Sequence, residues 1–347
     1  MDVARGKEIH RHLVYLGYNG DIFIAVRLVD LYAKCGSIED ACCLFDSIPK
    51  PDLVSWNILL AGYVRAKKFV DAFALYVRME VMGIKPDTIT VVEILQACIG
   101  LAAFEDGKRI HGCIIEWSFE EDVFICSNLM AMYAKCGSVN DAHVVFSKLK
   151  NPDLVSWNVM LRGCAEQGHC KETLELFEQI WKDHWHVNPD IVTFGCVLAA
   201  CSHGGLLEKG KHYFELMIRV YGHKPLPWHC ACIVDLLCRA GHLSEAEEFI
   251  DKLPIQPDVV VWMSLLGGCR NHNNATLGSY AFNNVIQIDV KHVSAYVLIT
   301  SIYAAVGKWE EAAAVRKAME TVGLEYQDDV QHSYLSTMLP SLLDNSI

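Results

Sequence analysis

Several features common in enzymes and membrane proteins are absent from this sequence. No apolar run approaches the roughly 18 residues that a membrane-spanning helix requires. No Cys-x-x-Cys pair and no His-x-Glu occurs, so the signature of the zinc-dependent nucleobase deaminases is missing. Neither a Walker phosphate loop nor a Gly-x-Ser-x-Gly nucleophile motif is present. We therefore expect a protein that is not itself an enzyme, holds no metal or cofactor and does not enter a membrane.

Basic residues are also few. Lys and Arg number 30 against 42 Asp and Glu, a net charge of −12, whereas a nucleic-acid-binding protein usually presents a basic surface. The 15 cysteines come without a secretory signal, so we expect reduced thiols. Those in HCAC (229–232) and CVLAACSH (196–203) are expected to be structural, because helical periodicity puts several of them in helix cores. Taken alone, the charge favours a protein partner.

What the sequence does contain is an internal repeat. The residues YAKCGS at 32–37 recur 101 residues later at 133–138, and PDLVSWN at 51–57 recurs at 152–158 with the same offset. GKEIH (6–10) and GKRIH (107–111) keep this offset too. An offset held over three separated segments identifies a repeat protein, in which each unit packs only on its neighbours.

The long repeat divides into shorter units, and each unit is predicted to be a helical hairpin. Within 53–87, Trp56, Leu59 and Tyr63 keep the spacing of one face of a helix, and a second amphipathic helix follows. The units end at regularly placed acidic residues: Asp21, Asp52, Asp87, Asp122, Asp153, Asp190 and Asp258. These Asp residues are also ordinary N-cap signals for the next helix, and both roles can coexist.

The punctuation of the hairpins is regular. A Gly is expected in the left-handed C-cap of the first helix, a Ser and an Asp three residues later to form a capping box for the second helix, and a Pro to stop the second helix. The Gly residues are Gly36, Gly137, Gly241 and Gly307; the boxes are Ser37 with Asp40 and Ser138 with Asp141; the Pro residues are Pro51, Pro86, Pro152, Pro189 and Pro257.

These segments resemble the pentatricopeptide repeat family, in particular its plant organellar class, in which P, L and S repeats alternate. The resemblance implies an all-α, right-handed superhelical solenoid of helix-turn-helix repeats. On this alignment 1–21 is a partial L repeat, followed by 22–52 (S), 53–87 (P), 88–122 (L), 123–153 (S), 154–190 (P), 191–226 (L) and 227–258 (S). Residues 259–325 resemble the E motifs of this class, and 326–347 form a divergent tail. No terminal DYW deaminase domain is expected.

The family reads single-stranded RNA one base per repeat, through the fifth and last residues of each unit. Carried over, the predicted reading pairs are Val26 with Asp52, Asn57 with Asp87, Val92 with Asp122, Ser127 with Asp153, Asn158 with Asp190, Gly195 with Leu226, and Ala231 with Asp258. Asn with Asp favours U and a small hydroxyl residue with Asp favours G, so 53–190 is predicted to read 5′-U-N-G-U-3′. A helix cap or a solvated polar position is the alternative role for Asn57 and Asn158.

Other positions are expected to hold the rest of the nucleotide. A column of basic residues at the thirteenth position of the units is predicted to contact phosphate: Lys34, Arg65, Lys135 and Arg239. At the second position, Phe23 and Phe124 are predicted either to wedge against bases or to join the core, as are Val54 and Val155.

The resemblance implies a site-recognition factor for C-to-U RNA editing in a plant mitochondrion or, alternatively, a chloroplast. Its partners would be single-stranded organellar RNA, a DYW-type deaminase protein acting in trans and organellar editing factors, with no DNA and no membrane. The alternatives are a protein-binding tetratricopeptide-like scaffold, which the acidic charge suits, and a fragmentary relative without activity. The first repeat, 1–21, lacks its first helix. We therefore expect either that upstream repeats have been lost or that this half-repeat itself caps the stack. The start does not resemble a transit peptide, because it has no Ser and carries Asp2 and Glu8.

Overall fold

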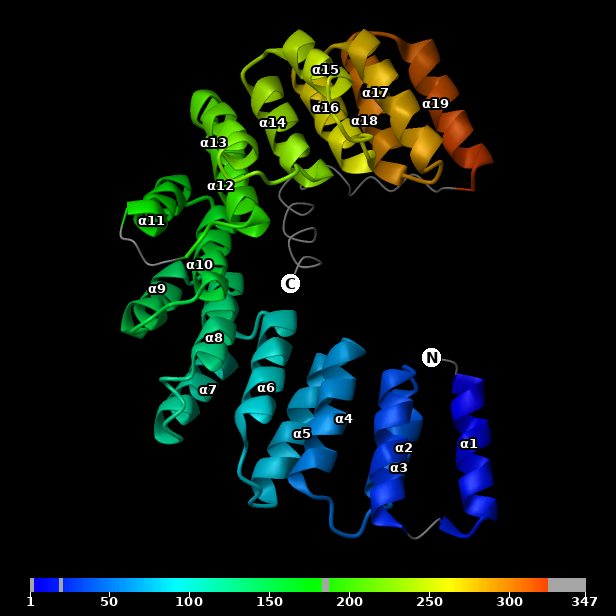
Figure 1. Cartoon of the computed structure of the whole chain (residues 1–347). Helices are drawn as coiled ribbons and strands as arrows, with labels where there is room; N and C mark the ends of the chain where they lie inside the picture. The colour runs from blue at the N-terminus through cyan, green and yellow to red at the C-terminus, as the bar shows by residue number, and fades with distance from the viewer. Residues whose placement is uncertain (1–2, 19–20, 183–186, 324–347) are drawn as a thin grey trace. The chain divides into compact units, whose positions relative to one another are not determined.

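The computed structural model describes residues 3–18, 21–182 and 187–323, and in these ranges it contains 19 α-helices and no strand (Figure 1). The all-α prediction is confirmed. The helices of the first half are α1 Val3–Tyr15, α2 Ile22–Lys34, α3 Ile38–Asp46, α4 Leu53–Arg65, α5 Phe69–Val81, α6 Thr88–Leu101, α7 Phe104–Glu116, α8 Val123–Lys135, α9 Val139–Lys148 and α10 Leu154–Glu166. Those of the second half are α11 Cys170–Lys182, α12 Ile191–His203, α13 Leu207–Arg219, α14 Pro227–Arg239, α15 Leu243–Asp251, α16 Val259–Asn271, α17 Ala275–Ile288, α18 Val293–Ala305 and α19 Trp309–Thr321.

The chain forms two compact units, Met1–Met160 and Leu161–Ile347, and the boundary between them in the sequence falls within α10. In the first unit, consecutive helices pair as hairpins, and the first helices of successive hairpins, α2, α4, α6 and α8, pack one on the next. In the second unit, α12, α14, α16 and α18 pack in the same way, each paired with the helix that follows it. Each unit is therefore a stack of helical hairpins, which is the predicted solenoid architecture.

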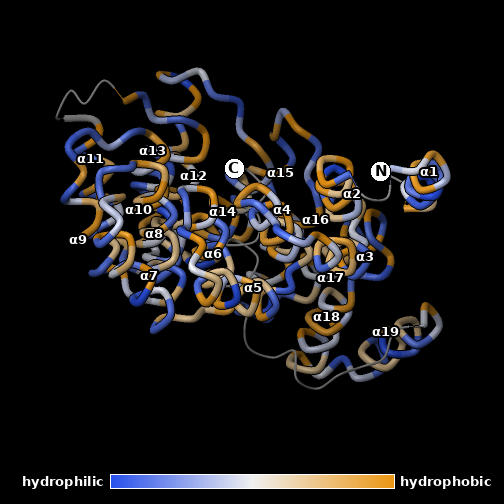
Figure 2. Tube along the Cα trace, turned by 90° about the horizontal axis from the view of Figure 1, so that it is seen from below, coloured by the Kyte–Doolittle hydropathy of each residue, from blue (hydrophilic) through white to orange (hydrophobic). Residues whose placement is uncertain are grey.

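The core of each hairpin lies between its helices and the next pair. Trp56 is 1% exposed and meets Phe45 edge-on with ring centroids 4.9 Å apart, and the equivalent Trp157 and Phe146 meet at 4.7 Å. Ala72, on α5, is fully buried as well. Hydrophobic and hydrophilic stretches alternate along the helices (Figure 2), as amphipathic packing requires.

The predicted punctuation is partly right. Gly36 and Gly137 follow the first helices with φ of 80° and 81°, the left-handed conformation that favours Gly. The predicted capping boxes at Ser37 and Ser138 are wrong. Both serines are N-caps, but their hydroxyls donate to the side chains of Asp40 and Asp141, at 2.7 and 2.6 Å, and make no hydrogen bond to the helix backbone.

The second helices end before the predicted prolines Pro51, Pro86, Pro152 and Pro257 are reached, which is a second correction. The prediction for Pro189 falls partly on residues 183–186, outside the described ranges. Helix α5 ends at Val81, before Gly83 with φ of 70° and before Pro86. Pro86 stands immediately before Asp87, the N-cap of α6. Because a residue that precedes Pro avoids the helical region, this Pro separates the two hairpins instead of ending the first of them.

Candidate nucleic-acid interface

Each repeat-terminal Asp caps the first helix of the following repeat. At Asp87, Oδ1 accepts from the backbone N of Thr90 at 2.9 Å, and the Thr90 hydroxyl in turn accepts from the backbone N of Asp87, a complete capping box. The same acceptance from the helix backbone occurs at Asp21, Asp52, Asp122, Asp153, Asp190 and Asp258. The carboxylates of all seven terminal residues are therefore held in place by a helix N-terminus.

The structure brings Asn57 and Asp87 together. Nδ2 of Asn57 donates to Oδ1 and Oδ2 of Asp87 at 3.0 and 3.1 Å, and Oδ1 of Asn57 accepts from the hydroxyl of Thr90 at 2.7 Å. Asn57 is 6% exposed and Thr90 fully buried. Hydrogen bonds from Thr90 and Asn57 lower the pKa of the Asp87 carboxyl even though partial burial raises it. The fifth and last residues of this repeat thus form one ordered polar cluster.

Ser127 and Asp153 are joined through a third residue. The Ser127 hydroxyl lies 3.1 Å from that of Ser156, which donates to Oδ1 of Asp153 at 2.7 Å. The backbone N of Ser156 also donates to this oxygen, at 2.8 Å. Ser156, like Thr90, is the third residue of the following repeat. Neither linking residue is among the site residues predicted from the sequence, although a hydroxyl residue at the third position of a repeat is a visible signal.

Three of the other predicted pairs have an apolar residue at the fifth position. Val26 and Val92 are half-buried and have no polar side-chain atom, so neither can hydrogen-bond to Asp52 or Asp122. Ala231 is 3% exposed and likewise apolar, while its predicted partner Asp258 caps α16.

Asn158 and Asp190 belong to different units. Asn158, in the first, is 6% exposed, the same value as Asn57. Asp190, in the second, forms a capping box with Thr193. Asn158 therefore keeps the burial of Asn57, and Asp190 keeps the capping role of Asp87.

The fifth position of the repeat 191–226, Gly195, has no space for a side chain. A Cβ added to Gly195 would overlap the six-membered ring of Trp228. Trp228 is the second residue of the next repeat, is 7% exposed and stacks on His229 with ring centroids 3.7 Å apart. The last residue, Leu226, is apolar. This repeat has neither a polar reader nor space for one.

The second-position residues of the repeats differ in exposure between the two units. In the first unit these apolar side chains are exposed: Phe23 67%, Val54 58%, Ile89 56%, Phe124 62% and Val155 49%. In the second unit, Val192 and Trp228 are buried, at 8% and 7%. The first unit therefore presents large apolar side chains to solvent close to its fifth-position residues, and Ile89 extends the set named from sequence.

The predicted phosphate contacts are all exposed but differ in their surroundings. Nζ of Lys34 lies 2.8 Å from Asp30, and Nε of Arg239 lies 2.7 Å from Asp235, in both cases four residues earlier on the same helix. The positive charge of Arg65 opposes the burial that raises the pKa of Glu93. Lys135 has Ala131 at the position where Lys34 has Asp30, so the charge of Lys135 is less neutralised than that of Lys34.

His229 illustrates how the second unit buries its polar groups. Nδ1 accepts from the backbone N of Leu226 at 3.1 Å, and Nε2 donates to the carbonyl of Ile191 at 2.9 Å. Burial lowers the pKa of His229 to about 4, and burial raises the pKa of nearby Cys230 to about 12. In the part of the chain that the structure describes, no group of three or more His, Cys, Asp or Glu is placed to hold a metal, and no helix is long and apolar enough to cross a membrane.

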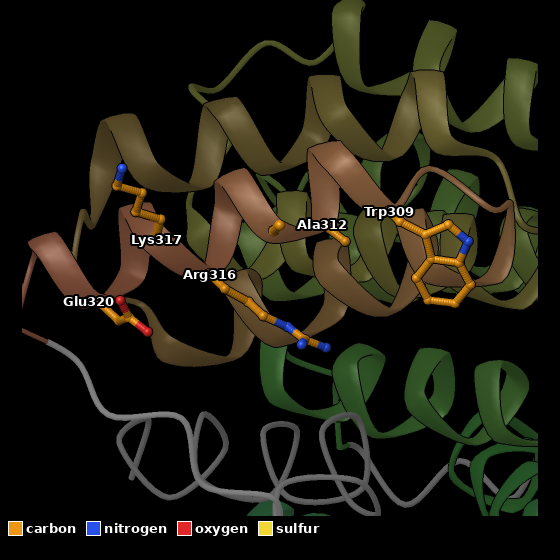
Figure 3. A pocket seen from close by; sticks show the side chains of 6 residues that line it. Trp309, Ala312, Arg316, Lys317 and Glu320 are labelled. Carbon is orange, nitrogen blue, oxygen red and sulfur yellow. The ribbon is translucent and has the colours of Figure 1, made fainter.

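A pocket also lies along α19 (Figure 3). Its lining combines an exposed aromatic side chain, small residues and charges of both signs: Trp309, Ala312, Ala313, Arg316, Lys317 and Glu320. It is distant in sequence from the fifth and last residues of the repeats and shares no residue with a reading pair.

Models of known protein families match these hairpins. The model of the PPR repeat family matches residues 51–99 and 152–203, and that of the PPR repeat matches 124–151, 192–220 and 229–254. The E motif model matches 272–328. The chain belongs to the pentatricopeptide repeat family. Its hairpins are therefore pentatricopeptide repeats, and the last hairpins carry an E motif.

Similar proteins come from Arabidopsis thaliana. Pentatricopeptide repeat-containing protein At2g33680 is 40% identical over 93% of this chain and 44% of its own length. Pentatricopeptide repeat-containing protein CRR2, chloroplastic, is 38% identical over 93% of this chain and 49% of its own length. The chain spans about half the length of these relatives or less.

Solved structures share the fold. The pentatricopeptide repeat protein PPR10 in complex with an 18-nt psaJ RNA element matches with a TM-score of 0.78 at 19% identity, over 91% of this chain and 47% of that chain. PPR10 from maize matches with a TM-score of 0.64 at 20% identity, over 86% and 44%. At this identity the likeness shows a common helical-repeat architecture.

Proposed function

We propose that this protein binds single-stranded RNA and reads bases with the fifth and last residues of its repeats. The observation that carries the proposal is the cluster of Asn57, Asp87 and Thr90, on helices α4 and α6 that also carry the exposed second-position residues Val54 and Ile89. Exposed apolar side chains can hold a base by its faces, while an ordered amide and carboxylate meet its edge. A scaffold for protein partners has no need of this repeated combination.

The proposed sequence read by 53–190 is 5′-U-N-G-U-3′. Asn57 with Asp87 and Asn158 with Asp190 would select U, Ser127 with Asp153 would select G, and Val92 leaves one nucleotide open. The ordered polar groups at Asn57 and Ser127 support the first U and the G, because a mismatched base would leave buried polar atoms unpaired.

We further propose a role in C-to-U editing in a plant mitochondrion or chloroplast, with a DYW-type deaminase supplied by another protein. The E motif and the relatives named as chloroplastic or mitochondrial support this. The repeats would select the site, and the protein itself would carry out no chemistry. Purified protein that converts cytidine to uridine without an added partner would contradict this division of labour.

Filter binding with an RNA pool tests the proposal. Binding should weaken as salt rises, because phosphate contacts release counterions, and selection should enrich U-N-G-U. A protein with no salt-sensitive RNA affinity would instead be the tetratricopeptide-like scaffold that its acidic charge suits.

A further inference from the structure

The repeat 123–153 contains a chain of three hydrogen-bonding side chains. It runs from Ser127, the fifth residue, through Ser156 to Asp153, the last residue. Ser127 is 5% exposed and Ser156 fully buried. Ser156 lies beyond the boundary of the repeat, in the first turn of α10. The middle member of the chain is therefore contributed by the following repeat.

The direction of each hydrogen bond in this chain is fixed by the carboxylate. A carboxylate only accepts, so the single hydroxyl proton of Ser156 goes to Oδ1 of Asp153, 2.7 Å away. The contact between the two serine hydroxyls at 3.1 Å is then a donation from Ser127 to Ser156. Ser127 has used its only proton, and its oxygen retains lone pairs alone.

We propose that Ser156 makes Ser127 an obligate hydrogen-bond acceptor and thereby selects guanine over adenine at this repeat, an inference that rests on the proposed reading of RNA. A free serine hydroxyl can donate or accept and discriminates poorly between these purines. On the Watson–Crick edge, guanine presents N1–H and N2–H donors beside its O6 acceptor, whereas adenine presents an N1 acceptor beside its N6–H donors. Where the Ser127 oxygen faces N1 of the base, an acceptor-only oxygen satisfies guanine and leaves two acceptors opposed in adenine. Ser156 is a positioning residue, because it acts on the base through Ser127.

The chain contains its own matched control. The segment PDLVSWN occurs at 51–57 as well as 152–158, and Ser55 repeats the contacts of Ser156 with the preceding Asp. The Ser55 hydroxyl and backbone N lie 2.5 and 2.9 Å from Oδ1 of Asp52. The fifth residue of the preceding repeat is Val26, which cannot hydrogen-bond. Ser55 therefore caps its helix as Ser156 does, without linking to a reader.

The test is competition between two RNAs that differ only in G or A at the third nucleotide of U-N-G-U. The full chain is compared as wild type, Ser156→Ala, Ser156→Thr and Ser55→Ala, with thermal unfolding of each. Wild type should prefer G by about tenfold or more, and Ser156→Ala should reduce the ratio to within about twofold. Ser156→Thr keeps the hydroxyl and should keep the ratio; Thr90 shows that a Thr fits this address.

The control and the contradicting results are distinct. Ser55→Ala should lower the unfolding temperature about as much as Ser156→Ala, since both lose the same contact to an N-cap, yet leave the G-to-A ratio at the wild-type value. An unchanged ratio in Ser156→Ala, with wild type preferring G, would overturn the role of Ser156 and leave RNA reading intact. A wild-type protein that does not distinguish G from A would overturn base reading at this repeat and the inference with it.

Discussion

The amide of Asn57 donates to both carboxylate oxygens of Asp87, at 3.0 and 3.1 Å, across a separation of 30 residues. This contact joins the fifth residue of one repeat to the helix cap of the next. It fixes the Asn57 amide with its nitrogen toward Asp87 and its oxygen toward Thr90. A base that meets Asn57 therefore encounters one orientation of donor and acceptor.

Replacing Asn57 by Thr should move the preference at the first nucleotide of U-N-G-U from U toward G. The change removes the amide donor and leaves a hydroxyl at the fifth position with Thr90 and Asp87 beyond it, in the same order as Ser127, Ser156 and Asp153. Competition between RNAs that differ at that nucleotide should show a shift of about tenfold or more in relative affinity. The ranking at the second nucleotide, opposite Val92, serves as the control and should not move. Identical rankings for wild type and Asn57→Thr would mean that Asn57 is only a structural residue.

Removing Lys135 should weaken RNA binding more than removing Lys34. The two lie in identical YAKCGS segments, but Lys34 is paired with Asp30 while the equivalent neighbour of Lys135 is Ala131. Lys135→Ala should lower the slope of log affinity against log salt by roughly one, uniformly across RNA sequences. Lys34→Ala should change it less. Equal slopes for both variants would show that the Asp30 pair does not reduce the availability of Lys34.

Gly195→Ala should destabilise the protein, and Trp228→Val should relieve the effect. The added Cβ overlaps the Trp228 ring, and forcing extra volume into a packed site typically costs about 1–3 kcal/mol. Urea unfolding of both single variants and the double variant measures the coupling. In the double variant, Gly195→Ala should cost much less than in wild type. Additive effects would show that α12 and α14 adjust without contact between these residues.

Stability should fall as the pH drops from about 6.5 toward 4, in part because of His229. Burial holds its folded-state pKa at about 4, below the ordinary histidine value of 6.5, so the unfolded chain binds the extra proton first as pH falls. Because the folded-state pKa of His229 is lowered, its contribution to stability is complete above pH 6.5 and is lost as pH falls through 4. The full shift corresponds to at most about 3 kcal/mol. Urea unfolding of His229→Gln should show a shallower dependence over this window than wild type.

Much of the architecture could be predicted from the sequence because it follows from periodicity. The spacing of Trp56 and Leu59 and the offset of 101 residues determine which faces are buried and where hairpins recur. The capping boxes were misplaced because the composition rule selects Ser37 with Asp40 and passes over Asp87 with Thr90, and only the geometry of the chain decides which side chain reaches backbone N–H groups.

The candidate site was predictable only in part. Alignment identified Asn57 with Asp87, and the contact between them follows from the stacking of α4 on α6. It could not indicate that Trp228 fills the space beside Gly195, because that depends on the rotamer of a large side chain in a neighbouring repeat. Nor could it identify Ser156, whose partner Ser127 lies 29 residues earlier.

Modular exchange of repeats has to respect this last relationship. A segment cut at 123–153 contains Ser127 and Asp153 but leaves behind Ser156, the hydroxyl that orients them. Placed before a helix whose third residue is Ile125 or another apolar side chain, the same segment would keep its two formal code residues and lose their hydrogen-bonded link. The functional module in this protein therefore extends past Asp153 into the first turn of α10. A graft that is to keep the base preference of this repeat must include the first turn of the helix that follows it.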